Sequence, residues 1–420
     1  MKIKIFKMKK NLFITLSFLF IIFITSAKER FVRVMFNSNA SYEATIIWDQ
    51  FSGKFESLYL DTIPINDKSE KQLNLSSSNN WKSMNNCIVR LKNLKADQRY
   101  YFKIKDSEGI SRNYYFSTVS DKPENPISFI GGGDSRDLRD VRSKANRLVA
   151  KLKPHAVLFN GDFIGIDIDN QWIDWFTDWE YTIDSDGRIT PMIVTRGNHE
   201  LTNAVIVNLF DVPNEDLYYN TIFGGTLLNL VSLNSEILKI GSQKAFLRKT
   251  LKEHQDFYWQ LPQYHRPIRS HVKSKKEMET QYRNFVPFFE KYPNVRLCLE
   301  NDSHTCKITW PIVSSNDSDA EEGFKRDDAK GIVYAGEGCW GAPLRPADDC
   351  KSWTRDAEGV NQFNWIFISK EKMELRTVKY ENEAMVEPLT EQTRFSMPKN
   401  IDLWGPKNGT LVEIFQQKTR

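Results

Sequence analysis

The stretch Ile127-Ser-Phe-Ile-Gly-Gly-Gly-Asp134 is an apolar run that ends in three glycines and an aspartate. Ala156 to Asp162 has the same form, and Pro191 to Glu200 ends similarly in Gly-Asn-His-Glu. Each apolar run predicts a buried strand, and the glycine after it lets the chain turn sharply and leaves the next side chain uncovered. Further strands are expected at 295–299, 332–334 and 363–368, and helices at 141–152, 243–251 and 275–291. Strands that alternate with helices predict an α/β sheet.

The polar side chains that follow the first three strands are Asp134, Asp162, Asn198 and His199. In an α/β sheet, groups just past the carboxyl ends of the strands converge on one crevice. Two carboxylates, an amide oxygen and an imidazole brought together there suit a hard-to-borderline divalent metal ion. Gly-Asp and Gly-Asn are common turn pairs, so the prediction depends on the three turns occurring together, each after a strand.

The second half of the chain is expected to supply the remaining ligands. His265 follows the apolar stretch 257–261, and His304 closes the segment Asn301-Asp-Ser-His304 after another predicted strand. His155 and His254 lie in or beside helical segments and are interpreted as structural or surface residues. Arg196 and His271 are weaker candidates for the pocket.

The first part of the sequence follows a different pattern. Between 31 and 118 short strands are separated by polar turns, with no helical periodicity. In Arg99-Tyr-Tyr-Phe-Lys-Ile104, alternate residues would share one face. The segment therefore predicts a β-sandwich, which a proline-marked linker at 120–126 joins to the α/β part.

The composition is that of a globular protein with more than one domain: 420 residues, 40% apolar and 27% charged. The net charge is +4, but five lysines lie in the first 27 residues, so the rest of the chain carries −1. Bulk charge therefore gives no support to a nucleic-acid or membrane-surface binder.

The amino terminus combines those lysines with the uncharged run 12–24 and the small residues Thr25, Ser26 and Ala27. This order predicts a secretory signal cut after Ala27, and hence a secreted or periplasmic protein without stable membrane association. The alternative is a retained anchor, for which the run is short, since a span needs about 20 apolar residues. Export permits disulfides, and Cys339 and Cys350, in one loop-like stretch, are the first candidate pair.

Gly-Asp, Gly-Asp, Gly-Asn-His-Glu, a strand-end histidine and a final histidine-containing turn, in this order, resemble the calcineurin-like metallophosphoesterases. The segments Leu91 to Phe102 and Tyr114 to Thr118 resemble the fibronectin type III-like domain that precedes the catalytic domain of purple acid phosphatases. The resemblance, over residues 31 to about 380, implies a four-layer α/β sandwich preceded by a small all-β fibronectin type III-like sandwich. The implied organisation is a signal peptide at 1–27, the β-sandwich at 28–120, the phosphoesterase domain at 121–380 and an extension at 381–420.

The resemblance also implies a role for each matched position. Two metal ions would be bound, with Asp162 bridging them and His199 meeting the leaving group. The first ion would be held by Asp134 and His304, and the second by Asn198 and His265. The implied reaction is hydrolysis of a small phosphate monoester by a metal-activated hydroxide, with no nucleic acid required. Arg136 either grips a phosphate oxygen or forms a surface salt bridge.

The chain departs from the family pattern at two positions. The family's Gly-His-x-His turn reads Asn301-Asp302-Ser303-His304 here, and Asp302 is expected to replace histidine as a ligand of the second ion. The alternatives are that Asp302 only orients a neighbour or that the site is damaged. Gly165 stands where iron-tyrosinate members carry tyrosine, so the purple chromophore is expected to be absent. Zinc, iron and manganese all remain open as the metal.

Two other functions remain open. A phosphodiesterase or nucleotidase would use the same pair of metal ions. A non-catalytic binding protein with a degenerate site would be consistent with the altered histidine turn. A structural calcium site fits poorly, because three histidines join the cluster.

Overall fold

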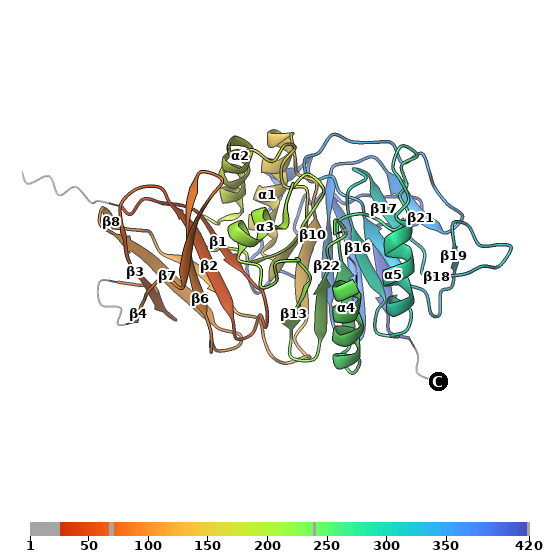
Figure 1. Cartoon of the computed structure of the whole chain (residues 1–420), viewed down its shortest axis with the longest axis horizontal. Coiled ribbons are helices and arrows are strands. Elements are labelled where there is room, and N and C mark those ends of the chain that lie inside the picture. Colours follow the sequence, from red (N-terminus) through yellow and green to blue (C-terminus); the bar gives the residue numbers. More distant parts are fainter. Residues whose placement is uncertain (1–25, 67–70, 238–240, 418–420) are drawn as a thin grey trace, which may run out of the picture.

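The computed structural model describes residues 26–66, 71–237 and 241–417 (Figure 1). The expected signal sequence lies, apart from its last two residues, outside the described ranges. Within those ranges, no helix is both long and apolar enough to cross a membrane.

Two large sheets form the centre of the molecule. In sheet order, the ten-stranded sheet contains β24 (Leu411–Phe415), β23 (Lys372–Lys379), β22 (Gln362–Ile368), β10 (Ile127–Gly132), β11 (Ala156–Asn160), β12 (Met192–Thr195), β1 (Glu29–Met35), β2 (Ala44–Gln50), β6 (Met84–Leu91) and β5 (Ser77–Trp81). The seven-stranded sheet contains β13 (Tyr219–Phe223), β14 (Leu228–Ser232), β15 (Trp259–Gln263), β16 (Leu297–Glu300), β20 (Val333–Gly336), β17 (Cys306–Thr309) and β21 (Thr354–Glu358).

Helices lie on the outer faces of these sheets (Figure 1). They are α1 (Arg139–Leu152), α2 (Asp169–Trp179), α3 (Asn203–Phe210), α4 (Gly241–Glu253) and α5 (Glu279–Phe289), with the short 3-10 helices η1 (Glu180–Thr182) and η2 (Glu383–Met385). Leu148 of α1 packs into the same core as Leu158 of β11. Leu247 of α4 and Phe285 of α5 pack with Val231 of the seven-stranded sheet.

The inner faces of the two sheets pack directly against each other. Phe129 and Leu158 of one sheet share a core cluster with Leu261 and Leu299 of the other. A Cβ added at Gly131 of β10 would lie 3.2 Å from Cδ1 of Leu299, so the sheets meet closely at the end of β10. Helix, sheet, sheet and helix are four layers, which confirms the predicted α/β sandwich.

The N-terminal part is all β, as the sequence predicts, and lies at one end of the molecule (Figure 1). A third sheet contains β4 (Gln72–Leu73), β3 (Phe55–Asp61), β7 (Arg99–Asp106) and β8 (Gly109–Ile110), and β9 (Tyr114–Ser117) pairs with β7. Along β7 every second residue is buried, including Tyr100, Phe102 and Ile104. The likeness of this N-terminal part to a fibronectin type III domain stays a prediction, as do the domain boundaries at 27, 120 and 380.

The N-terminal strands continue the central sheet. Met35 of β1 pairs in parallel with Met192 of β12, and β2 and β6 follow outward from β1. The four strands β1, β2, β6 and β5 are therefore part of the same ten-stranded sheet as the strands that precede the candidate site.

One segment differs from the sequence expectation, and another adds a strand to the central sheet. The helix expected over 275–291 begins at Glu279, because the chain before it forms a turn in which the Lys275 N–H donates to the Val272 carbonyl. The C-terminal extension supplies β24, which pairs with β23 at the edge of the sheet. A short hairpin of β18 (Ile312–Ser314) and β19 (Phe324–Arg326) completes the described strands.

All five cysteines are free. Cys339 is buried and Cys350 is exposed, so the expected pairing of these two residues is not formed.

Candidate metal centre

Three parallel strands bring the first set of candidate residues to one edge of the ten-stranded sheet. β10, β11 and β12 are neighbours in parallel register, and Asp134, Asp162 and Asn198 follow their ends. The loops after β11 and β12 touch, because a Cβ added at Gly161 would lie 2.3 Å from the backbone nitrogen of Gly197. Gly161 also has a φ of +84°, so the close approach and the backbone conformation both require glycine.

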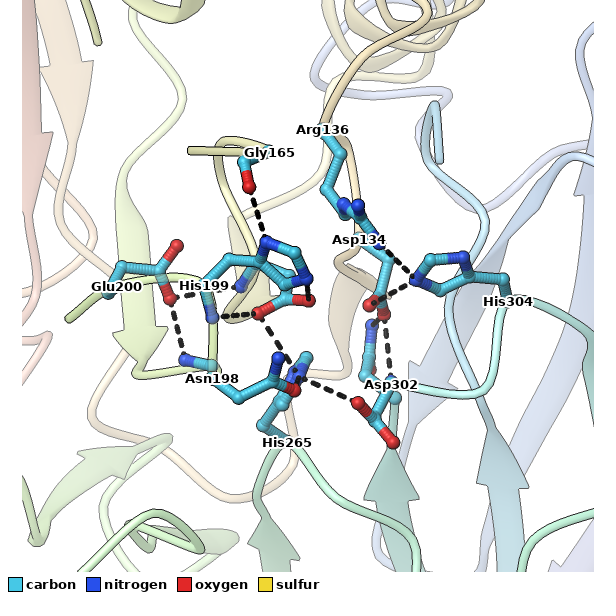
Figure 2. A network of polar contacts seen from close by, with 12 residues as sticks. Asp134, Arg136, Gly165, Asn198, His199, Glu200, His265, Asp302 and His304 are labelled. Carbon is cyan, nitrogen blue, oxygen red and sulfur yellow. Dashed lines mark hydrogen bonds and ion pairs between the residues drawn. The ribbon is translucent and has the colours of Figure 1, made fainter. Parts of the chain in front are cut away.

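The seven-stranded sheet brings in the second set. β15 ends just before His265, and its parallel neighbour β16 ends just before the segment 301–304. Asp302 and His304 both have left-handed backbone, with φ of 75° and 59°. The two sheets therefore deliver their loops to the same crevice from opposite sides (Figure 2).

Asp134, Asp162 and His304 form one candidate ligand group. Each offers a ligand atom, these atoms lie within 4.8 Å of one another, and all three residues are buried. His304 Nε2 is 3.4 Å from Asp134 Oδ1. That oxygen is buried and has no hydrogen-bond partner among the described residues. A buried carboxylate oxygen without a donor fits a position that a cation would occupy.

Asp162, His265 and Asp302 form a second group with the same geometry. His265 Nε2 is 3.3 Å from Asp162 Oδ1 and 3.6 Å from Asp302 Oδ1. It is also 3.3 Å from Asn198 Oδ1, which adds an amide oxygen to this group. Asp162 belongs to both groups, so the geometry fits two adjacent ions that share one carboxylate.

The two histidines are oriented in the way that metal ligands require. Nδ1 of His265 donates to the Asn160 carbonyl at 2.8 Å, and Nδ1 of His304 donates to the Pro343 carbonyl at 3.0 Å. Because Nδ1 carries the hydrogen in both rings, Nε2 is the nitrogen that faces the carboxylates. Figure 2 shows both rings directed toward the centre.

The electrostatics of the cluster also fit cation binding. Burial acts to lower the pKa of His265, but Asp162 and Asp134 raise it well above its usual range. Burial acts to raise the pKa of Asp302, but His265 and Lys275 hold it below its usual range. His265 Nε2 faces oxygens of Asp162, Asp302 and Asn198, and a metal ion bound there would take the place of a proton on this nitrogen.

His199 lies at the margin of the cluster. Its N–H donates to Asp162 Oδ1 at 3.0 Å, and its ring Nδ1 donates to the Gly165 carbonyl at 2.5 Å. Nε2 is 3.7 Å from Asp162 Oδ2, and a quarter of the side chain is exposed. His199 therefore presents Nε2 toward the crevice, where a leaving group would be accessible to it.

Glu200 secures the turn that carries Asn198 and His199. Its buried carboxylate accepts the N–H groups of Asp162, Phe163 and Gly197 at 3.1, 2.9 and 2.7 Å. Burial, followed by the charge of Asp162, raises the pKa of Glu200 to about 8. Glu200 thus ties the loop after β11 to the loop after β12.

Arg136 lies beside the first group. Its Nη1 is 3.4 Å from His304 Nε2, its Nη2 is 3.6 Å from Asp137, and the side chain is 17% exposed. Its Nε is buried and has no hydrogen-bond partner among the described residues. The guanidinium thus faces the crevice as well as the surface carboxylate of Asp137.

Two residues outside the predicted set contact the cluster. Asn301 Nδ2 donates to Asp134 Oδ2 at 3.0 Å, and Lys275 Nζ is 2.8 Å from Asp302 Oδ1. Asn301 lies within the predicted turn 301–304, and this position is the feature of the sequence from which its contact with the cluster could be predicted. Lys275 fell within an expected helix, and no pattern in the sequence marks it.

The weaker sequence candidates lie elsewhere. Arg196 donates to the Glu200 carbonyl at 2.9 Å and braces the turn. His271 Nε2 is 2.7 Å from Thr354 Oγ1, in a network behind the cluster. At Gly165, an added Cβ would lie 2.0 Å from Asp137 Oδ1, so any side chain there requires Asp137 to move.

Residues 131–306 match the family model of the calcineurin-like phosphoesterases. Purple acid phosphatase PPD1 from yellow lupin (Lupinus luteus) has a similar fold, with a TM-score of 0.69 and 15% identity over 85% of this chain and 73% of the lupin chain. The structure of PhoD matches with a TM-score of 0.66 and 10% identity over 94% of both chains. No curated protein matches the sequence of this chain.

The family match begins at Gly131 in β10 and ends just past His304, so it includes every residue of the two ligand groups. Residues 131–306 therefore form a calcineurin-like phosphoesterase domain, and the chain is a metal-dependent phosphoester hydrolase.

Proposed function

We propose that this chain is an exported phosphomonoesterase with a dinuclear metal centre. The observation that carries the proposal is the pair of buried ligand groups that share Asp162. One carboxylate common to two groups of this kind is what a pair of adjacent divalent ions needs. The lupin protein of similar fold is a purple acid phosphatase, which further supports hydrolysis of phosphate esters.

The proposed ligands follow from these groups. Asp162 would contact both ions, and the other ligands would divide between the two sides of the crevice. The first ion is assigned to Asp134 and His304, and the second to Asn198, His265 and Asp302. When bound, a pair of zinc, iron or manganese ions activates water as the nucleophile and neutralises charge on the phosphate.

The protein supplies the remaining steps through its own side chains. His199 holds its Nδ1 hydrogen against the Gly165 carbonyl, so any proton given to the leaving group comes from Nε2. Arg136 carries a guanidinium beside His304, where it can bind a phosphate oxygen. Asn301 and the Asp302 N–H hold Asp134 Oδ2, which leaves Asp134 Oδ1 free for the first ion.

The activity can be tested with two model esters. The mature protein, supplied in turn with zinc, manganese and iron, is expected to hydrolyse p-nitrophenyl phosphate faster than bis(p-nitrophenyl) phosphate. Asp162→Asn is expected to abolish the activity and lower the metal content below two ions per chain. His199→Ala is expected to lower kcat by about 10²- to 10⁴-fold with the metal retained, because it removes only a proton donor.

His254→Ala is the matched control for the histidine, since His254 bonds to the Thr250 carbonyl at 2.8 Å, remote from the cluster. It is expected to match the wild type in both metal content and rate. A wild type no faster than Asp162→Asn under any metal would contradict the enzyme proposal. Faster hydrolysis of the diester would instead assign the site to phosphodiesters.

One contact near the amino terminus places a carboxylate beside the expected cleavage site. The backbone nitrogen of Lys28 is 2.7 Å from Asp106 Oδ2. Cleavage after Ala27 would make this nitrogen the terminal ammonium, which gains an ion pair with the carboxylate already in place. The signal-like sequence of residues 1–27 supports a location of the mature protein outside the cytoplasm.

A further inference from the structure

A cationic side chain lies against the residue that departs from the family pattern. Lys275 Nζ is 2.8 Å from Asp302 Oδ1, and the same oxygen is 3.6 Å from His265 Nε2. The Lys275 side chain is 22% exposed, whereas that of Asp302 is 7% exposed. The ammonium therefore lies between the second ligand group and solvent.

The backbone around Lys275 is held in place. The Lys275 N–H donates to the Val272 carbonyl at 2.9 Å and closes a turn before α5. The Lys273 N–H donates to Asp348 Oδ1 at 2.9 Å, and the Asp349 N–H donates to the His271 carbonyl at 3.1 Å. These bonds tie the segment that carries Lys275 to the loop 346–349.

The position of Lys275 matters because the site carries an additional negative charge. Asp302 adds a third buried carboxylate to Asp134 and Asp162, where the family's turn has a neutral histidine. An additional negative charge opposes the approach of an anionic phosphate. Lys275 offsets that charge on the side of the second group, as Arg136 adds positive charge beside His304 in the first.

We infer that Lys275 binds an oxygen of the substrate phosphate and thereby favours the dianion of a monoester over the monoanion of a diester. The inference rests on the proposed function and deepens it by naming a residue that sets the preference for monoesters. An ammonium attracts a doubly charged phosphate more strongly than a singly charged one, and a monoester has one more terminal oxygen to accept its hydrogen bond. Lys275 is thus a substrate-binding residue that compensates for the aspartate at position 302.

The test compares Lys275→Met with Lys275→Arg and with Lys276→Met. Methionine keeps most of the length of the side chain and removes the charge, arginine keeps the charge, and Lys276 is an exposed lysine that directly follows the turn. For each protein, kcat/KM is measured with p-nitrophenyl phosphate and bis(p-nitrophenyl) phosphate. Binding of inorganic phosphate to the metal-loaded protein is measured by calorimetry, and the metal content by elemental analysis.

Lys275→Met is expected to lower kcat/KM for the monoester by about 10- to 100-fold, the usual effect of losing a charged hydrogen bond, chiefly through KM. The loss for the diester is expected to be only a few-fold, and inorganic phosphate is expected to bind correspondingly more weakly. Metal content is expected to stay at the wild-type value. Lys275→Arg is expected to retain most of the monoester preference, and Lys276→Met to match the wild type.

Equal losses on both esters, or a loss of metal in Lys275→Met, would show that Lys275 only positions Asp302 and would overturn the inference. The calorimetry separates this inference from the proposed function. If the wild type hydrolyses neither ester, the proposed function fails. In that case weaker phosphate binding by Lys275→Met still supports a phosphate contact, and unchanged binding refutes it.

Discussion

Asp134, Asp162, Asp302 and His304, four of the six proposed metal ligands, have left-handed backbone, with φ between 53° and 75°. Residues other than glycine seldom adopt this conformation, and each instance costs about 1–3 kcal/mol. These strained residues form the sharp turns that bring side chains from two sheets to one point. The strain is therefore a result of the geometry of the site. Contacts around the turns, such as those of Glu200 with three N–H groups, stabilise them.

Gly161 is the residue at which this strain can be tested. An added Cβ would lie 2.3 Å from the Gly197 nitrogen, at a φ of +84°. Gly161→Ala is expected to lower the free energy of unfolding by about 3 kcal/mol or more, measured by urea denaturation, because the clash is with backbone that cannot rotate away. Metal binding is expected to weaken with it, since the loops after β11 and β12 would separate.

Gly241→Ala is the control, because a Cβ at Gly241 would meet none of the described atoms within 4 Å. This residue begins α4, where alanine is expected to change the free energy of unfolding by less than about 1 kcal/mol. If both variants lose a similar free energy of unfolding, the destabilisation by Gly161→Ala does not result from close packing around Gly161.

At the scale of elements, a buried ion-pair network joins three strands of the seven-stranded sheet behind the metal centre. Lys307 of β17 lies 2.5 Å from Glu300 of β16 and 2.8 Å from Glu337, which follows β20. Burial acts to lower the pKa of Lys307, but the two carboxylates raise it above its usual range. The Glu337 carbonyl accepts the His304 N–H at 2.7 Å, so the network also supports a proposed ligand.

Lys307→Met is expected to lower the free energy of unfolding by about 3–5 kcal/mol, since it leaves two buried carboxylates without their cation. Thermal and urea denaturation measure the loss. Lys325→Met is the matched control, because Lys325 pairs with Asp317 on an exposed loop. Its expected effect is within about 1 kcal/mol. A small effect at Lys307 would mean that the two glutamates take up protons in the variant at little cost.

At the scale of the whole molecule, the N-terminal strands and the phosphoesterase domain share one sheet. β1 covers the edge of β12, the strand that leads into Asn198 and His199. At the other end of the sheet, β24 from the C-terminal extension pairs with β23. Both ends of the described chain therefore contribute strands to the sheet that carries the site.

The mature chain is expected to begin at Lys28, with its terminal ammonium paired to Asp106. Expression with the signal in a bacterium, followed by mass analysis of the exported protein, checks the cleavage site. Asp106→Asn is expected to lower the melting temperature of the mature protein by a few degrees, because it removes the charged partner. An intact N-terminus at Met1, or protein retained in the membrane fraction, would contradict the export proposal.

The family resemblance implied the four layers and the full set of ligands, whereas the residue patterns were sufficient to predict an α/β sheet, an all-β N-terminal part and polar side chains just past three strand ends. These features depend on local patterns: an apolar strand, a glycine and a polar side chain just past the strand end. Asp134, Asp162 and Asn198 could be found in this way because residues just past the ends of neighbouring parallel strands lie at the same edge of the sheet.

Which distant side chains meet depends on how the two sheets pack. Lys275 reaches Asp302 because a turn replaces the expected first turn of α5, and Asn301 reaches Asp134 although 167 residues separate them in the chain. The pairing of β1 with β12 likewise joins segments that are separated in the chain by the linker and by all the strands from β2 to β11. Such contacts depend on the packing of whole sheets, and a single sequence contains no local signal for them.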